Sequence, residues 1–155
     1  MRPLNKTLCV KKMIDRSARN KLAELLRSLA SGMISNDQFE ESIPDSEDKA
    51  IYEVFFNGGW CLYSDMKEYK LKGKDALEQV VKKEVARWVL FLKSNNEYAW
   101  PNVPVLQRTL HVFSFGLLGT SYAKVWAASG DVDVWPFLKA EHFSKAKEEH
   151  GYLGK

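Results

Sequence analysis

Apolar residues recur at helical spacing in several separate segments of the chain. The first segment follows Asp15 and ends at Ser31-Gly32, where a glycine suits the end of a helix. Its apolar residues are Ala18, Leu22, Leu25, Leu26 and Leu29. Steps of three and four residues place these side chains on one helical face. We therefore expect a helix that buries its leucines and holds Arg16, Arg19 and Lys21 outward.

Two further helices are expected before residue 60. Ser35 or Asn36 can cap a short helix, which would form a hairpin with the first one. Pro44 then interrupts helical structure. The side-chain oxygens of residues 45–48 can cap a third helix, which ends or bends at 57–59. The segment 60–71 fits both additional helical turns and a short extended stretch, so its structure stays open.

The clearest periodic pattern runs from Asp75 to Lys93. Leu77, Val81, Val85, Trp88 and Leu92 follow one another at steps of three and four residues. At about 1.5 Å per residue such a helix would be nearly as long as a small domain is wide. We expect it to be the spine of the hydrophobic core.

The segment from Val105 to Leu118 is apolar almost all round and indicates a centrally buried helix, although its alternation also permits a strand. Another helix is expected after Thr120 or Ser121, and a polar one ending near His150. The chain is therefore predicted to be all-α, a single-domain compact bundle of six or seven helices with a central buried helix. This domain would cover residues 1–155, with 1–14 as a loosely packed segment.

Composition agrees with one ordinary globular domain, since 45% of the residues are hydrophobic and 28% are charged. The longest unbroken apolar run is Trp88 to Leu92, far short of the roughly 20 residues that span a bilayer. The first residues also lack the apolar core of a signal peptide. Cys9 and Cys61 cannot build a disulfide framework. A soluble, cytoplasmic protein with reduced thiols is expected.

Charge is distributed unevenly along the chain. Residues 1–27 hold eight Lys and Arg against two acidic residues, a net charge of +6, whereas residues 28–58 hold seven Asp and Glu against Lys49, a net charge of −6. The two segments could complement each other as neighbouring surfaces. Alternatively, the basic one would bind phosphates, or the acidic one a basic partner.

Two groups of residues are candidates for such contacts. The protein-binding candidates are the acidic residues Asp37, Glu40, Glu41, Asp45, Glu47 and Asp48 together with Trp100 and Trp135. The two tryptophans precede prolines in loops, where they would either cover the core or act as exposed anchors. The nucleic-acid-binding candidates are Lys12, Arg16 and Arg19, whose spacing of three and four residues could follow a phosphate backbone.

A third group is a set of polar residues within apolar surroundings. It consists of Asp65, Glu84, Arg87, Arg108 and His111. Charges beside a core are costly unless paired, so structural ion pairs such as Arg108 with Glu84 are the expected role. The functional alternative is a small polar cleft in which Arg108 and His111 bind an anion or act on a substrate.

Motifs of catalysis and cofactor binding are missing from the sequence. The three histidines have no metal-ligand spacing, and the glycines match neither phosphate-binding loop. No nucleophile motif of the G-x-S-x-G type occurs. We therefore expect no metal, no cofactor and no enzymatic activity.

Two stretches resemble known proteins. Leucines followed by Gly32-Met33-Ile34-Ser35 and then Phe39 resemble the short C-terminal domain, a two-helix motif that implies oligomerisation or protein contacts. The runs 84–92, 98–101, 130–131 and 135–137 resemble a family of small single-domain bacterial proteins of unknown function. That likeness implies a bacterial source and no catalytic residue.

These observations favour a non-enzymatic protein-interaction module, and self-association is one form that its contacts could take. An immunity-type protein that neutralises a cognate bacterial toxin fits this class, because an acidic patch suits a toxin with a basic nucleic-acid-binding cleft. The alternatives are a nucleic-acid-associated protein that uses the basic N-terminal helix, and an unrecognised enzyme with a small polar cleft.

Overall fold

The computed structural model describes residues 14–101 and 128–149. Within these ranges the chain forms α-helices and short 3-10 turns, and the described residues contain no β-strand. The α-helices are α1 (Arg16–Ala30), α2 (Asn36–Glu41), α3 (Lys49–Asn57), α4 (Gln79–Lys93) and α7 (Ala140–Glu149), and the 3-10 turns are η1 (Gly59–Leu62), η2 (Gly73–Asp75) and η3 (Val132–Val134). The helical class is confirmed for these residues. The helices expected at 105–118 and after Thr120 lie outside the described ranges, so the predicted total of six or seven stays a prediction.

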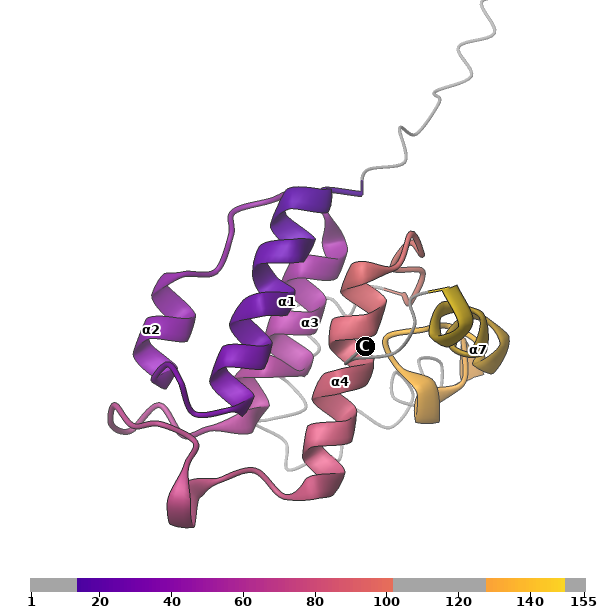
Figure 1. The fold of residues 1–155 in the computed structure, drawn as a ribbon. Coiled ribbons are helices and arrows are strands. Elements are labelled where there is room, and N and C mark those ends of the chain that lie inside the picture. The colour runs from indigo at the N-terminus through magenta and orange to yellow at the C-terminus, as the bar shows by residue number, and fades with distance from the viewer. Residues whose placement is uncertain (1–13, 102–127, 150–155) are drawn as a thin grey trace, which may run out of the picture.

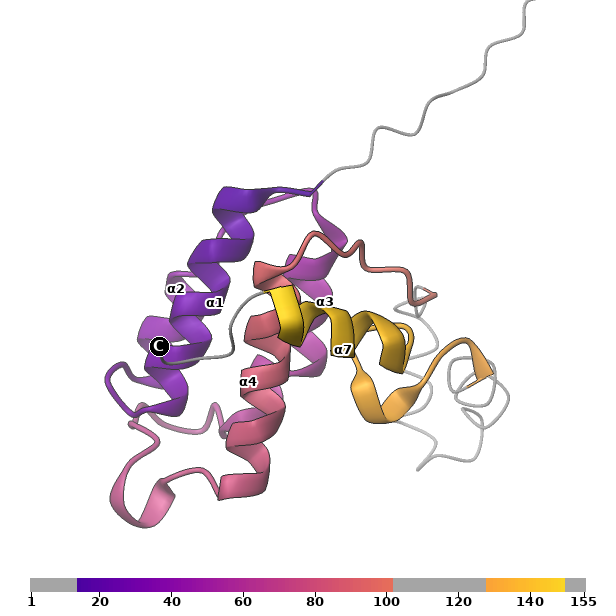
Figure 2. The ribbon, with the colours of Figure 1, turned by 45° about the vertical axis from the view of Figure 1, so that its right-hand side comes forward.

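The core of the described structure lies between α1 and α4, which run antiparallel side by side (Figures 1 and 2). Helix α3 lies behind them, α2 flanks α1, and α7 packs across the other side of α4. No helix in the described part of the chain is long and apolar enough to cross a membrane. The spine predicted from periodicity is therefore central, and α1 is its main partner.

Helix α1 forms where the periodicity predicted it. The Asp15 side chain accepts a hydrogen bond from the backbone N–H of Ala18 and so caps the first turn. The leucines at 22, 26 and 29 are completely buried. The helix ends at Ser31 and Gly32, and Gly32 has a φ of 70°, which favours glycine.

The short helix α2 is held by a capping box. The hydroxyl of Ser35 accepts from the backbone N–H of Gln38, while the Gln38 side chain accepts from the backbone N–H of Ser35. Asn36 fastens the loop 64–70 to this helix, because its side chain donates to the carbonyls of Ser64 and Lys67 and accepts from the backbone N–H of Tyr69. The apolar pattern did not decide the secondary structure of residues 60–71. They form the end of η1 and then a loop that is hydrogen-bonded to Asn36.

Helix α4 starts at Gln79, four residues after the predicted start at Asp75. The chain forms η2 at 73–75 and is extended at Ala76 and Glu78, and Glu78 makes no capping hydrogen bond. Leu77 therefore precedes the helix, although it still packs against the core. Five consecutive residues of the last part, 88–92, are buried, so this part of α4 is enclosed almost all round.

Candidate functional site

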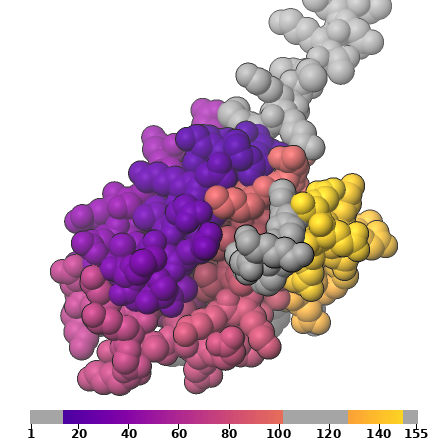
Figure 3. Space-filling model, in the orientation of Figure 1, coloured from indigo at the N-terminus to yellow at the C-terminus, as the bar shows by residue number. Residues whose placement is uncertain are grey.

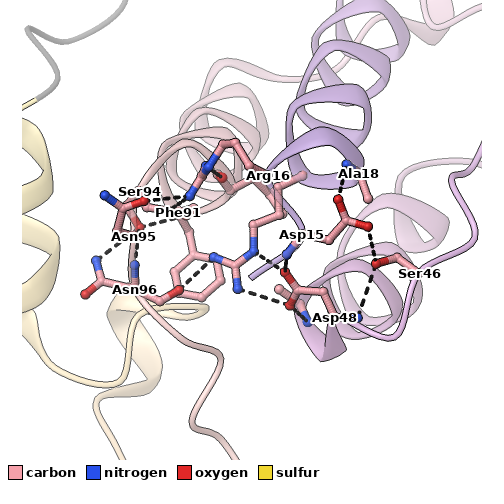
Figure 4. A network of polar contacts seen from close by, with 12 residues as sticks. Asp15, Arg16, Ala18, Ser46, Asp48, Phe91, Ser94, Asn95 and Asn96 are labelled. Atoms are coloured by element: carbon pink, nitrogen blue, oxygen red, sulfur yellow. Dashed lines mark hydrogen bonds and ion pairs between the residues drawn. The ribbon is translucent and has the colours of Figure 1, made fainter. Parts of the chain in front are cut away.

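The predicted phosphate-binding arginines form an internal polar network instead (Figure 4). Arg16 donates from its guanidinium to the carbonyls of Leu92 and Ser94, both at 2.7 Å, and to the side chain of Asn95 at 2.9 Å. These carbonyls belong to the end of α4, where helical hydrogen bonds run out. Arg16 therefore caps α4, and burial followed by the charge of Arg19 lowers its pKa.

Arg19 lies at the centre of this network and is only 1% exposed. Its Nε donates to Asp48 Oδ2 at 2.6 Å and Nη2 to Asp48 Oδ1 at 3.1 Å, while Nη1 donates to the carbonyl of Asn96 at 2.7 Å. The guanidinium also lies over the ring of Phe91, 5.4 Å from its centroid. The expectation that Arg19 faces outward was wrong, because its charge is neutralised inside the fold.

Asp48 belongs to the same network and is 3% exposed. Besides Arg19, it accepts hydrogen bonds from the backbone N–H groups of Asp15 and Ala50. Ser46 joins it to Asp15, since the Ser46 hydroxyl donates to Asp15 and accepts from the N–H of Asp48. Asp48 therefore caps α3 and holds the starts of α1 and α3 together, so it is not an exposed protein-binding residue.

Because of these contacts, two of the three predicted nucleic-acid-binding residues are not free to bind phosphates. Arg16 and Arg19 use their N–H groups within the protein, and Lys12 lies outside the described residues. Arg19 could contact a phosphate only by giving up Asp48. The described residues therefore provide no support for a basic phosphate-binding helix.

The described members of the predicted polar set, Asp65, Glu84 and Arg87, do not all lie together in the structure. Glu84 and Arg87 form an ion pair with each other, and Arg87 Nε donates to the carbonyl of Trp135 at 2.7 Å. Asp65 is exposed in the loop after η1. Arg108 and His111 lie outside the described ranges, so the polar cleft stays a hypothesis, and Glu84 serves to fasten the 135–137 loop through Arg87.

Trp100 and Trp135 are core residues, with 3% and 7% of their surface exposed. The Trp100 Nε1–H points to the carbonyls of Pro136 and Phe137, at 3.1 and 3.2 Å. The Trp135 Nε1–H donates to the hydroxyl of Tyr98 at 3.2 Å. The alternative in which these loops cover the core is confirmed, and the two rings are not exposed anchors.

The remaining acidic candidates are exposed. Asp37, Glu40 and Glu41 belong to α2, while Asp45 and Glu47 precede α3. Within the described ranges no group of three or more His, Cys, Asp and Glu side chains could hold a metal ion. These carboxylates are therefore available as a negatively charged surface.

An exposed row of aromatic rings lies on α3 and η1. The rings of Tyr52 and Phe56 in α3 are tilted by 42° with centroids 4.4 Å apart, and Phe56 meets Trp60 of η1 edge-to-face at 5.3 Å. Tyr52 is 47% and Trp60 42% exposed, whereas Phe56 is half-buried. This row was not predicted from the sequence, although the spacing of four residues between the three aromatics places them on one side of a helix.

A buried aromatic cluster connects the row to α2. Phe55 contacts both Phe56 and Phe39, with centroids 4.7 and 5.8 Å apart, and Phe39 contacts Tyr63 at 6.1 Å. Burial, and next the carboxylate of Glu40, raises the pKa of Tyr63. Glu40 therefore lies beside the aromatic cluster rather than on a remote part of the surface.

The buried cluster thus joins the exposed aromatic row of α3 and η1 to the Tyr63 ring, which Glu40 and Asp65 approach. We call the residues Glu40, Tyr52, Phe56, Trp60 and Asp65 together the acidic–aromatic face. The charge of Asp65 also raises the pKa of Tyr63. Asp37 and Glu41 lie on the exposed side of α2 next to Glu40. Lys49 of α3 and Lys67 of the loop 64–70 are exposed cations.

Comparison with models of protein families, with curated proteins and with solved structures found no match for this chain.

Proposed function

We propose that this protein is a protein-interaction module that binds a basic partner through the acidic–aromatic face. The observation that carries the proposal is the exposed aromatic row, which the buried cluster joins to the Tyr63 ring near Glu40 and Asp65. Tyrosine and tryptophan are enriched among the residues that contribute most to binding energy in protein interfaces. Carboxylates around such anchors favour a partner that carries Lys and Arg.

The row is well suited to binding because its geometry is set before a partner arrives. Phe56 is held between Tyr52 and Trp60, and Phe55 ties it to the buried ring of Phe39. Rings that are already ordered lose little conformational entropy on binding. Surface carboxylates speed encounter with a basic partner and make the association sensitive to salt.

The test measures binding of a defined basic probe, a synthetic amphipathic helix with Lys and Arg on one face and Leu on the other. Isothermal titration calorimetry should detect binding that weakens with salt, and the same helix with Glu in place of its cations should not bind. The double variant Tyr52→Ala and Trp60→Ala should weaken binding at least tenfold. Val132→Ala removes an exposed apolar residue elsewhere and is the matched control.

Charge is tested separately from the aromatic rings. The double variant Glu40→Lys and Asp65→Lys should lower affinity and reduce its salt dependence, because two carboxylates of the face are lost. Glu141→Lys on α7 is the control for net charge alone. Equal loss in the control and the face variants, or equal binding of the acidic probe, would refute a specific basic-partner surface.

We also propose the immunity-type role as the finer form of this function. An acidic surface with aromatic anchors would cover the basic nucleic-acid-binding cleft of a toxin. The informative experiment is co-expression with the product of a neighbouring toxin-like reading frame. The wild-type chain should relieve growth arrest, and the Tyr52→Ala, Trp60→Ala variant should not, while both accumulate to the same level.

A further inference from the structure

A second surface feature lies between α1 and α4, and none of its lining residues belongs to the acidic–aromatic face. The C-terminal end of α1 and residues 82–89 of α4 line an open groove of about 320 Å³. Both helices reach the surface on the face shown in Figure 3, α1 in indigo and α4 in pink. Ala30 of α1 and Val85, Ala86 and Val89 of α4 provide its apolar lining.

Two cations line the same groove, one from each helix. Arg27 belongs to α1 and Lys82 to α4, and both side chains are largely exposed. Among the described residues of the lining, Ser31 is the only other polar one, and it donates its hydroxyl to the carbonyl of Ser28 at 3.1 Å. The groove therefore combines an apolar floor with positive charge at both walls.

The positive charge is not balanced by the acidic residues nearby. Glu24 is shared between Arg27, at 3.7 Å, and Lys93, at 3.1 Å. In the described part of the chain, Lys82 forms no ion pair. An anionic group placed between Arg27 and Lys82 would gain two charge-assisted contacts that the fold itself does not supply.

We propose that this groove binds a small amphiphilic anion, an aliphatic carboxylate whose head lies between Arg27 and Lys82 and whose chain lies along Ala30 and Ala86, above the buried Val85 and Val89. Its volume is at the lower end of the range of about 300–1,000 Å³ typical of ligand pockets. A short acyl chain fits such a space, whereas a cofactor-sized molecule does not. The site is independent of the acidic–aromatic face and of any partner bound there.

Octanoate is the probe, used well below the concentration at which it forms micelles. Titration followed by two-dimensional ¹H–¹⁵N NMR should shift the amide signals of Ala30, Val85, Ala86 and Val89 in a saturable way. Octylammonium has the same chain and the opposite charge, and we expect it to bind at least tenfold more weakly. Equal binding of the two probes, or shifts confined to other residues, would overturn the proposal.

Variants separate the contribution of the head from that of the chain. Lys82→Gln and Arg27→Gln should each weaken octanoate binding several-fold, and together abolish the preference over octylammonium. Lys83→Gln removes the neighbouring exposed cation of α4, which does not line the groove, and is the matched control. If Lys83→Gln weakens binding as much as Lys82→Gln, general charge attraction explains the effect and the site is refuted.

Filling the groove provides a test that does not depend on charge. Ala86 is only partly buried, so Ala86→Phe should place its ring in the groove without disturbing the core. Octanoate binding should be lost while far-UV circular dichroism and the melting temperature stay near those of the wild type. Unchanged octanoate affinity in a folded Ala86→Phe protein would contradict the proposed location.

Discussion

At the residue scale, two arginines one turn apart on α1 have different tasks. Arg16 reaches the carbonyls that end α4, a favourable place for a cation because the helix dipole is negative there. Arg19 is buried in an ion pair with Asp48 and carries no solvent-exposed charge. A buried charge is tolerated only while its partners remain, so the two positions should respond differently to substitution.

Arg19→Met should lower the free energy of unfolding by about 3–5 kcal/mol, because it leaves the buried carboxylate of Asp48 without its cation. Urea denaturation measures the loss. Lys21→Met, on the exposed side of the same helix, is the control and should change stability by less than about 0.5 kcal/mol. A loss below about 1 kcal/mol for Arg19→Met would contradict the buried pair.

The Tyr63 hydroxyl gives a second prediction at the residue scale. It is buried and forms no hydrogen bond of normal geometry, and burial with the nearby Glu40 carboxylate raises its pKa above the ordinary value. A raised pKa in the folded state means that the neutral phenol contributes stability below about pH 10. That stability is lost as the pH rises above the pKa of the unfolded chain.

Tyr63→Phe should therefore remove part of the loss of stability at alkaline pH and be close to neutral in stability at pH 7. Urea denaturation at a series of pH values from 7 to above 10 measures both effects. Tyr52→Phe, which alters an exposed ring, is the matched control. An unchanged alkaline profile for Tyr63→Phe would show that this phenol does not govern it.

At the element scale, the end of α1 depends on a close approach of the chain at Gly32. A Cβ added there would lie 2.9 Å from the carbonyl oxygen of Leu71 and 2.9 Å from Cβ of Lys72. The capping residues Asp15, Ser35 and Asp48 mark the starts of α1, α2 and α3, and each caps through its own side chain. Helix ends are thus set by local sequence, but Gly32 is also required by a distant loop.

Gly32→Ala should cost about 2–3 kcal/mol, since it adds a steric clash to the strain of a positive φ. Gly73 is the natural control, because its φ is 60° and a Cβ there would meet nothing within 4 Å. Gly73→Ala should therefore cost only about 1 kcal/mol. Thermal or urea unfolding of the two variants measures the difference, and equal losses would contradict the close packing at Gly32.

At the scale of the whole molecule, α4 joins the N-terminal helices to the C-terminal part. Trp88 lies against Gly58 at the end of α3 and packs on Trp135, with ring centroids 5.8 Å apart. Phe91 contacts Phe137 at 5.1 Å, and Phe137 is almost completely buried. These aromatic contacts connect both sides of α4 through one continuous core.

Trp88→Ala should lower the free energy of unfolding by about 3–5 kcal/mol, because it opens a cavity at the junction of these parts. Unfolding should also be a single transition in which tryptophan fluorescence and far-UV circular dichroism change together. Two separate transitions in the wild type would show that the parts on either side of α4 unfold independently. Val80→Ala, an exposed apolar residue of α4, is the control.

The sequence by itself determined the helical class of the described chain and most helix boundaries. Leucine periodicity and the caps Asp15 and Ser35 are local properties, and the structure contains the helices that they predict. The late start of α4 was not predictable from the apolar pattern, because Leu77 packs on the core from an extended segment as well as it would from a helix. Periodicity reports burial, and several backbone conformations can bury one side chain.

Only the tertiary structure decided which polar and aromatic residues face solvent. Arg19 and Asp48 are far apart in sequence and look like surface charges, yet the fold pairs them in the interior. Trp100 and Trp135 can be buried because distant carbonyls and a hydroxyl accept their N–H groups, while Tyr52 and Trp60 remain 47% and 42% exposed. A side chain's role depends on partners that become its neighbours only when the chain folds.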